Sequence, residues 1–178
     1  MRAAIAARME ECRLELHPVK TKIVYCKDDD RRRRYCNEKF DFLGYGFQPR
    51  RSKNRFGKYF INLSPAISDE AGQAIRGEIH SWKLHLRSDK AIEDLSRMFN
   101  PKIRGWLQYY GHYYRSALYP YMRQLDRSLA HWAHRKYKKL RGHLRRAQHW
   151  IARISRRDPK LFAHWQMGGR RGSMAGAV

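Results

Sequence analysis

Apolar residues recur every three or four positions through most of the chain beyond residue 67, a spacing that predicts amphipathic helices. Ser68, followed by Asp69 and Glu70, is typical of a helix N-terminus, because the hydroxyl can cap the helix and the carboxylates favour its dipole. We expect Ser88 to cap a second helix and Pro101 to lie in the first turn of a third. The expected helices cover residues 68–86, 88–99, a stretch from 101 through an aromatic cluster, a stretch from 120, and 144–155.

The first part of the chain has a different pattern. After a helix expected over residues 2–13, short runs of β-branched and aromatic residues predict strands at 20–26, 40–47 and 56–63. The last two are expected to form a β-hairpin with a basic tip at residues 49–54. The sequence therefore predicts an α+β fold, mostly α: a small N-terminal β-hairpin piece followed by a helical bundle.

The change of pattern near residues 63–68 suggests where the chain divides. We expect one domain over residues 1–66, which contains the hairpin, and a helical domain over residues 67–165. Residues 166–178 are rich in Gly, Ala and Arg, and we expect a disordered tail there.

The net charge of the chain indicates which class of partner it binds. The formal net charge is +23 over 178 residues, which implies a polyanionic partner, with nucleic acid ahead of anionic membrane. No apolar run approaches the roughly 20 residues that span a bilayer, and the start of the chain lacks the pattern of a signal peptide. Three cysteines without a CxxC pair favour free thiols in a reducing compartment, so we expect a cytoplasmic protein.

Most of the excess charge lies in the second half. Residues 95–178 carry 19 Lys or Arg and only two carboxylates, Asp126 and Asp158. The segment 100–115, NPKIRGWLQYYGHYYR, also interleaves aromatic rings with cations, as a single-stranded or irregular RNA surface requires. The residues expected to contact RNA are Arg104, Trp106, Tyr110, Tyr114, Arg115, Arg127, Arg135, Lys136, Lys138, Lys139, Arg141, Arg145 and Arg146.

Alternatives remain open for several of these residues. Positions 106, 109, 110 and 113 share one helical face, so some of their rings are expected in the core. A basic run is ordinarily a solvated face, but the 11 Lys or Arg between residues 127 and 157 have no acid among them to neutralise them. His131 and His134 have a spacing compatible with a metal, although no further ligand is nearby in sequence, so a basic surface is the favoured interpretation.

Three segments in series resemble proteins encoded by group II introns. Residues 101–110, PKIRGWLQYY, resemble the signature of the maturase-specific region, also called domain X. Residues 14–24, LELHPVKTKIV, resemble the reverse-transcriptase segment that follows the catalytic hairpin, and residues 40–47, FDFLGYGF, resemble the primer-grip region. The resemblance covers roughly residues 10–165 and implies the end of a reverse-transcriptase palm, a thumb and a maturase domain.

The resemblance also implies roles for residues. Lys20 would lie near the incoming nucleotide, and the Phe42-Leu43-Gly44-Tyr45 strand would help to hold the primer end. The carboxylates that hold two metal ions for polymerisation belong to motifs that precede residue 1, including Tyr-x-Asp-Asp. Asp28 and Asp29 have the wrong spacing and order for that motif, and a solvated loop is expected there. We therefore expect no metal site, catalytic residue or cofactor in this chain, with Mg²⁺ supplied only by bound RNA or by a separate palm.

Two functions follow from these observations. The first is an RNA-binding maturase-type module that assists the folding and splicing of a group II intron without polymerase chemistry. The alternative is the thumb half of an RNA-directed DNA polymerase that acts with a separate fingers–palm chain, and a non-functional remnant is the third possibility. The expected partners are structured intron RNA and, for the alternative, that second chain, with no membrane.

Overall fold

The computed structural model describes residues 2–18, 21–27, 33 and 35–168. Lys20, Asp28 and Asp29, and the tail beyond residue 168 lie outside the described residues. The chain forms two compact units, one from residues up to 40 together with 48–63, the other from 41–47 together with residues from 64 onward. Each unit is described by itself below. The domain division expected from the sequence stays a prediction.

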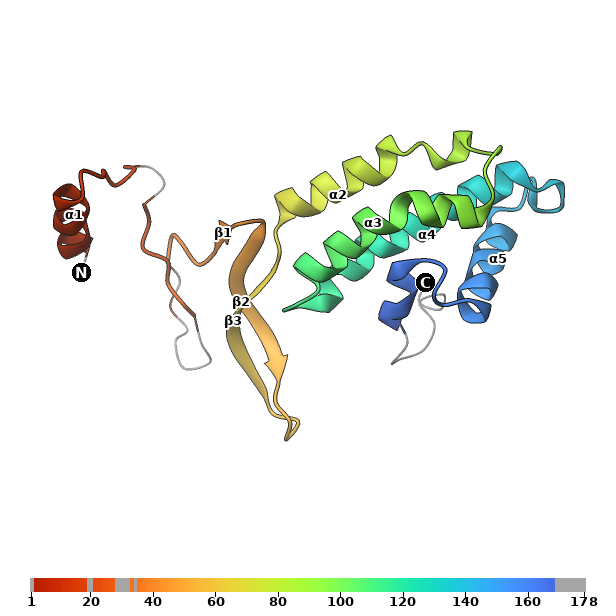
Figure 1. Cartoon of the computed structure of the whole chain (residues 1–178). Helices are drawn as coiled ribbons and strands as arrows, with labels where there is room; N and C mark the ends of the chain where they lie inside the picture. The colour runs from red at the N-terminus through yellow and green to blue at the C-terminus, as the bar shows by residue number, and fades with distance from the viewer. Residues whose placement is uncertain (1, 19–20, 28–32, 34, 169–178) are drawn as a thin grey trace. The chain divides into compact units, whose positions relative to one another are not determined.

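The prediction of an α+β fold, mostly α, is confirmed (Figure 1). The N-terminal region contains helix α1 (Arg2–Glu11) and a three-stranded antiparallel sheet in the order β1-β2-β3. Strand β1 spans Phe40–Phe42, β2 spans Tyr45–Lys53 and β3 spans Tyr59–Ile67. Figure 1 shows β2 and β3 as a long twisted ribbon.

The strand expected over residues 40–47 is interrupted by a tight turn. Leu43 has φ 50° and Gly44 has φ 76°, so the two residues between β1 and β2 both take the left-handed conformation of a two-residue hairpin loop. Beyond the turn, β2 continues through Pro49, where the sequence predicted the tip of the hairpin. Pro49 is tolerated because β1 is only three residues long and leaves that edge of β2 uncovered.

The strand expected over residues 20–26 is not formed by the described residues 21–26. Tyr25 donates one backbone hydrogen bond to the carbonyl of Asn37 at 2.8 Å, and the rings of Tyr25 and Tyr35 lie 4.1 Å apart. A single bond does not make a ladder, so the β-prone composition of this segment is not sufficient for a strand here.

Four α-helices and four short 3₁₀ helices make up the rest of the described chain. Ser68 caps α2 as predicted, because its Oγ accepts a hydrogen bond from the N–H of Ala71 at 3.2 Å. The elements in order are α2 (Asp69–Ser81), η1 (Leu84–Leu86), α3 (Ile92–Tyr110), η2 (Arg115–Leu118), α4 (Tyr119–Lys136), η3 (Lys138–Leu140), α5 (Leu144–Arg157) and η4 (Ala163–Gly168).

The two helices predicted on either side of Pro101 are one helix, α3. It begins at Ile92 rather than near Ser88, because the Asp94 carboxylate accepts the N–H of Ala91 at 3.0 Å. Pro101 lies inside it and removes one backbone hydrogen bond. The core contacts of the buried residues Phe99 and Ile103, one on each side of Pro101, favour a continuous helix over the break that proline prefers.

Helix α4 forms the centre of the core and packs against α2, α5 and three of the 3₁₀ helices. Met122, Leu125, Leu129 and Trp132 are fully buried, and they recur at the three- and four-residue spacing of an amphipathic helix. Helix α3 packs against η4, where the buried Asn100 side chain donates to the carbonyl of Leu161 and accepts from the N–H of Ala163. Figure 1 shows these helices gathered together.

Candidate nucleic-acid interface

Four tyrosines gather where the Leu43–Gly44 turn meets the end of α3. The ring of Tyr45, the first residue of β2, lies 5.2 Å from Tyr109, 5.6 Å from Tyr110 and 5.6 Å from Tyr113, measured between centroids. Tyr109 and Tyr110 also meet edge to face at 4.8 Å. These distances are in the range of favourable aromatic pairs. We call Tyr45, Tyr109, Tyr110 and Tyr113 the tyrosine cluster.

Hydrogen bonds fix the turn to this cluster. The Tyr45 hydroxyl donates to the carbonyl of Tyr109, and the Tyr109 hydroxyl donates to the carbonyl of Leu43 at 2.8 Å. The N–H of Ser68 donates to the carbonyl of Gly44 at 2.9 Å. A Cβ atom at Gly44 would lie 2.9 Å from the Tyr110 hydroxyl, so only glycine allows this approach.

The pKa values of two phenols in the cluster are raised. Burial, followed by the neighbouring phenols Tyr109, Tyr113 and Tyr110, raises the pKa of Tyr45 above its ordinary value of 10.0. Burial and then Tyr109 raise the pKa of Tyr110 as well. Both shifts favour the protonated phenol, which is the form that donates a hydrogen bond.

The aromatic residues expected to contact RNA differ in how accessible they are. Trp106 is half-buried and stacks on the buried ring of Trp82 at 5.6 Å, and Tyr110 is half-buried against the core and below Gly44. Tyr114 is exposed at the start of η2, with 38% of its surface accessible. Tyr109 and Tyr113 were not among the predicted RNA contacts, yet they are 47% and 61% exposed.

The cations expected at the interface are exposed with one exception. Lys136 is half-buried: its Nζ donates to the carbonyl of Lys90 and lies 5.4 Å from the Trp132 ring. These contacts give Lys136 a structural role at the end of α4. The exposed cations of the predicted set are Arg104, Arg115, Arg127, Arg135, Lys138, Lys139, Arg141, Arg145 and Arg146.

Most of the exposed basic residues of α4 and α5 fall into two rows. Because residues four apart lie on one face of a helix, each row presents a continuous stripe of side chains. The α4 row consists of Arg123, Arg127, His131 and Arg135. The α5 row consists of Arg145, His149, Arg153 and Arg157. The two helices pack against each other. Arg123, Arg153 and Arg157 were missed in the sequence analysis, although the spacing of four was visible.

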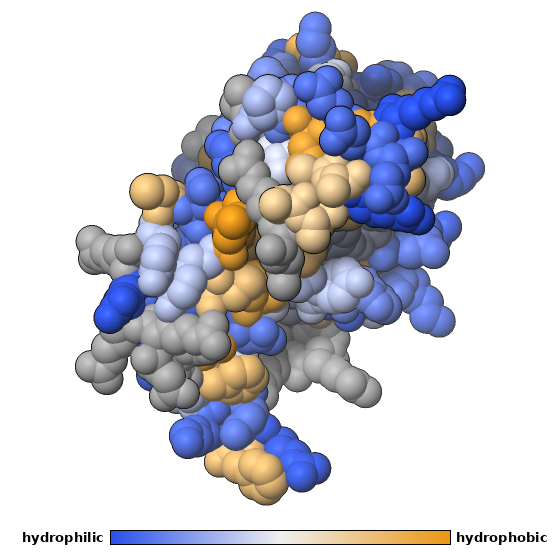
Figure 2. Space-filling model, turned by 90° about the vertical axis from the view of Figure 1, so that its left-hand side faces the viewer, coloured by the Kyte–Doolittle hydropathy of each residue, from blue (hydrophilic) through white to orange (hydrophobic). Residues whose placement is uncertain are grey.

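The two carboxylates of this half of the chain make other contacts. Asp126 Oδ1 accepts from Trp165 Nε1 at 2.8 Å and lies 2.9 Å from His164 Nε2. Asp158 Oδ1 accepts the backbone N–H of Lys160 at 3.3 Å. The sequence supplies no other Asp or Glu between residues 95 and 178, so the rows keep their positive charge. Figure 2 shows the left-hand side of the view in Figure 1, where hydrophilic residues are interspersed with apolar ones.

A shallow groove begins where the α4 row meets the end of α2. Its floor is apolar, with Ile79 and Leu84 almost completely buried. Its polar lining is basic or neutral: His80, Lys83, His85, Ser128, His131, His134 and Arg135. One of these histidines is already engaged, because His134 Nε2 accepts the backbone N–H of Gly142 at 2.9 Å. Within the described part of the chain, no group of three or more His, Cys, Asp or Glu is placed to hold a metal ion.

Residues 73–150 match the family model described as group II intron, maturase-specific domain. The match supports a protein of the group II intron maturase type. Below, residues 73–150 are named after the model that they match; this segment extends from α2 into α5, so it contains α3, the α4 row and the groove. No curated protein and no solved structure is significantly similar to the chain.

The resemblance of residues 14–24 and 40–47 to a reverse transcriptase lies outside the matched segment and stays a prediction. Of the residues carried by that resemblance, Phe42, Leu43, Gly44 and Tyr45 lie in or beside the turn that contacts α3. None of the helices in the described residues is long and apolar enough to cross a bilayer.

Proposed function

We propose that the maturase-specific domain binds structured group II intron RNA and assists its folding and splicing. The observation that carries the proposal is the pair of exposed basic rows on α4 and α5, which lie largely within the matched segment and have only two carboxylates, Asp126 and Asp158, near them in sequence. A surface of this charge is stable beside a polyanion, and RNA phosphates supply one.

The proposed role requires no chemistry from the protein. A large RNA folds against the repulsion of its own phosphates, and magnesium ordinarily screens that repulsion. Fixed Arg and Lys side chains replace part of the magnesium, and each phosphate contact releases condensed counterions. Exposed rings such as Tyr114 add stacking on unpaired bases. Together these contacts stabilise the folded RNA, whose own active site performs the splicing.

Splicing at low magnesium tests the proposal. The substrate is any group II intron found next to the coding sequence, because an intron-encoded protein is expected to act on its own RNA. We expect the full chain to raise the splicing rate at a magnesium concentration where the RNA alone is slow. A generic basic protein of equal charge is the control. Equal stimulation by both proteins would contradict a specific maturase role.

A second candidate is the thumb part of an RNA-directed DNA polymerase. Two observations favour it: the turn that resembles a primer grip is held by three hydrogen bonds, and the segment that resembles the palm exposes apolar side chains. Leu14 is 59% exposed and Ile23 is 75% exposed, as expected for residues that a palm would cover.

Primer extension separates the two candidates. The chain is mixed with a fingers–palm chain that carries the Tyr-x-Asp-Asp carboxylates, and extension on an RNA template is measured with magnesium. Extension by the mixture, combined with no effect of the chain alone on splicing, would favour the polymerase role. Splicing stimulated by the chain alone would favour the maturase role.

A further inference from the structure

The tip of the β2–β3 hairpin is a defined turn. Asn54 and Lys58 form its ends: the Asn54 N–H donates to the Lys58 carbonyl at 2.9 Å, and within the loop the Gly57 N–H donates to the Asn54 carbonyl at 3.0 Å. Asn54 Oδ1 also accepts the N–H groups of Phe56 and Lys58, both at 2.9 Å. Gly57 has φ 83°, the left-handed conformation that closes a three-residue hairpin loop. The turn therefore holds Phe56 in an outward position.

The ribbon combines exposed rings with unopposed positive charge. Phe56 is 79% exposed, Tyr59 52% and Phe60 38%, although large aromatic side chains of this kind are usually covered. Residues 48–63 contain five Lys or Arg and no Asp or Glu. A basic tip was predicted in this region, but no function was assigned to it.

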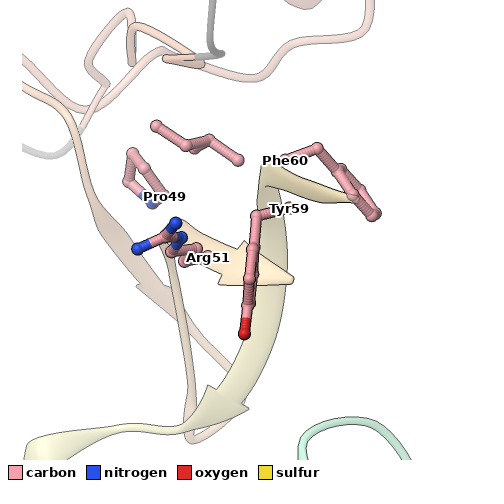
Figure 3. A pocket seen from close by; sticks show the side chains of 5 residues that line it. Pro49, Arg51, Tyr59 and Phe60 are labelled. Carbon is pink, nitrogen blue, oxygen red and sulfur yellow. The ribbon is translucent and has the colours of Figure 1, made fainter. Parts of the chain in front are cut away.

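The cations lie directly against the rings. The Arg51 guanidinium is 4.2 Å from the centroid of Tyr59 on the adjacent strand, and Lys53 Nζ is 5.5 Å from the same ring. At the tip, the Arg55 guanidinium is 4.7 Å from the centroid of Phe56. Figure 3 shows the hollow beside Arg51 and Tyr59, which Pro49, Phe60 and Ile61 complete. Each cation is thus placed to meet a phosphate while a base stacks on a ring or on a guanidinium plane.

We propose that the ribbon, residues 48–63, is a separate binding site for unpaired RNA, with bases stacking on Phe56 and on the Arg51–Tyr59 pair. Unpaired strands fit because their bases are free to leave the stack, whereas a duplex hides the faces of its bases. Stacking of this kind tolerates any base. The site lies in the first compact unit, outside the maturase-specific domain, and the inference does not depend on the role of that domain in splicing.

Photocrosslinking locates the contact. The full chain is bound to a short oligouridine that carries 5-iodouridine, irradiated, and digested for mass spectrometry. We expect crosslinks at Phe56 or Tyr59, because this base reacts with an aromatic ring on which it stacks. Crosslinks confined to residues 95–168 would overturn the proposal and leave the proposed function of the helical domain intact.

Affinity measurements supply the second test. Replacing both rings, Phe56→Ala with Tyr59→Ala, is expected to weaken oligouridine binding at least about tenfold, or about 1.4 kcal/mol, because the bases lose both rings on which they stack. Phe56→Trp with Tyr59→Phe keeps both rings and should keep the affinity. Tyr35→Ala removes a ring from the same unit, 49% exposed, and is the matched control. A loss of equal size in Tyr35→Ala would overturn the proposal.

The same variants distinguish RNA from other polyanionic surfaces. Loss of the two rings should lower the affinity for duplex RNA of equal length much less than the affinity for oligouridine. Vesicles of phosphatidylserine and phosphatidylcholine test an anionic membrane. If the double alanine variant loses vesicle binding but keeps oligouridine binding, the ribbon is a membrane contact and the proposal is wrong. Circular dichroism of each variant checks that the helical content is unchanged.

Discussion

The Tyr109 hydroxyl donates a hydrogen bond to the carbonyl of Leu43 at 2.8 Å, although 66 residues separate the two. The bond joins the turn between β1 and β2 to helix α3, which lies within the segment that matches the family model. The Tyr45 hydroxyl also donates a hydrogen bond, to the carbonyl of Tyr109. The turn and the end of α3 therefore hold each other in place. Because this arrangement lies beside the exposed rings of Tyr113 and Tyr114, changes to the turn should affect both stability and RNA binding.

Gly44→Ala is expected to destabilise the chain by about 1–3 kcal/mol, through a strained positive φ and a clash with Tyr110. Thermal or denaturant unfolding followed by circular dichroism measures the change. Tyr110→Phe in the same chain should recover part of the loss, because it removes the hydroxyl that the new methyl group meets at 2.9 Å. Gly77→Ala is the control, since no atom lies within 4 Å of its added Cβ in α2. Equal losses in Gly44→Ala and Gly77→Ala would contradict the packing described for the turn.

Asp126→Ala should be more costly than a typical surface substitution. The carboxylate faces two donors from η4, His164 and Trp165, and His164 is completely buried. Leaving buried polar groups without their partner costs about 1–3 kcal/mol. Asp158→Ala removes the other carboxylate of this half, which is exposed, and should change stability by no more than about 0.5 kcal/mol. If both variants unfold at the same denaturant concentration, the Asp126 contacts do not hold η4 to α4.

The periodic part of the fold could be predicted from the sequence, because local spacing determines which face of a helix is buried. The inward residues of α4 and the Ser68 cap follow from spacing and side-chain chemistry alone. Pro101 was misinterpreted because packing overrides its local preference. Proline usually ends a helix, but here core residues on both sides keep α3 continuous. Residues 40–47 were predicted as one strand in which Gly44 and Gly46 allow a bend or a close backbone approach. The aromatic pattern continues through this stretch, so the two-residue turn at Leu43 and Gly44 was not predicted.

The candidate site was predictable in its charge but not in its contacts. The basic and acidic residues of a segment can be counted in the sequence. The tyrosine cluster, in contrast, requires Tyr45 to contact residues more than 60 positions away. The contacts of Lys136 were not predictable from the sequence either. Its position in a basic run favours RNA contact, yet its ammonium group binds the carbonyl of Lys90, a residue 46 positions earlier.

Stability should decrease at alkaline pH through the tyrosine cluster. The folded chain raises the pKa of Tyr45 and Tyr110 above 10.0, so the unfolded chain loses these protons first. Their contribution is fully present below pH 10 and is lost as the pH rises through the folded-state pKa values. Denaturant unfolding at a series of pH values measures the slope. Tyr45→Phe with Tyr110→Phe should flatten that slope above pH 10, and an unchanged slope would mean that other groups cause it.

Tyr114→Ala should weaken RNA binding without changing its salt dependence. Stacking on one base contributes about 1–3 kcal/mol and releases no counterions, so affinity falls while the slope of log affinity against log salt stays constant. Tyr114→Phe keeps the ring and should bind as the unchanged chain does. Filter binding to the intron RNA at a series of KCl concentrations gives both quantities. A reduced slope for Tyr114→Ala would show that the residue acts by positioning cations.

Removing three exposed cations near the end of α4 should weaken RNA binding and also lower its salt dependence. Lys138, Lys139 and Arg141 are exposed, whereas Lys136 is left in place because its contacts are structural. Each lost phosphate contact lowers the salt slope by about 0.7–0.9, so changing all three residues to Gln should lower it by about 2–3. Lys22, Arg33 and Lys39 are exposed cations of the first compact unit, and their replacement by Gln removes the same charge. If this control lowers the slope equally, the RNA responds to net charge alone and the basic surface of the maturase-specific domain is not the binding site. A lower slope only in the first variant places the phosphate contacts on that surface.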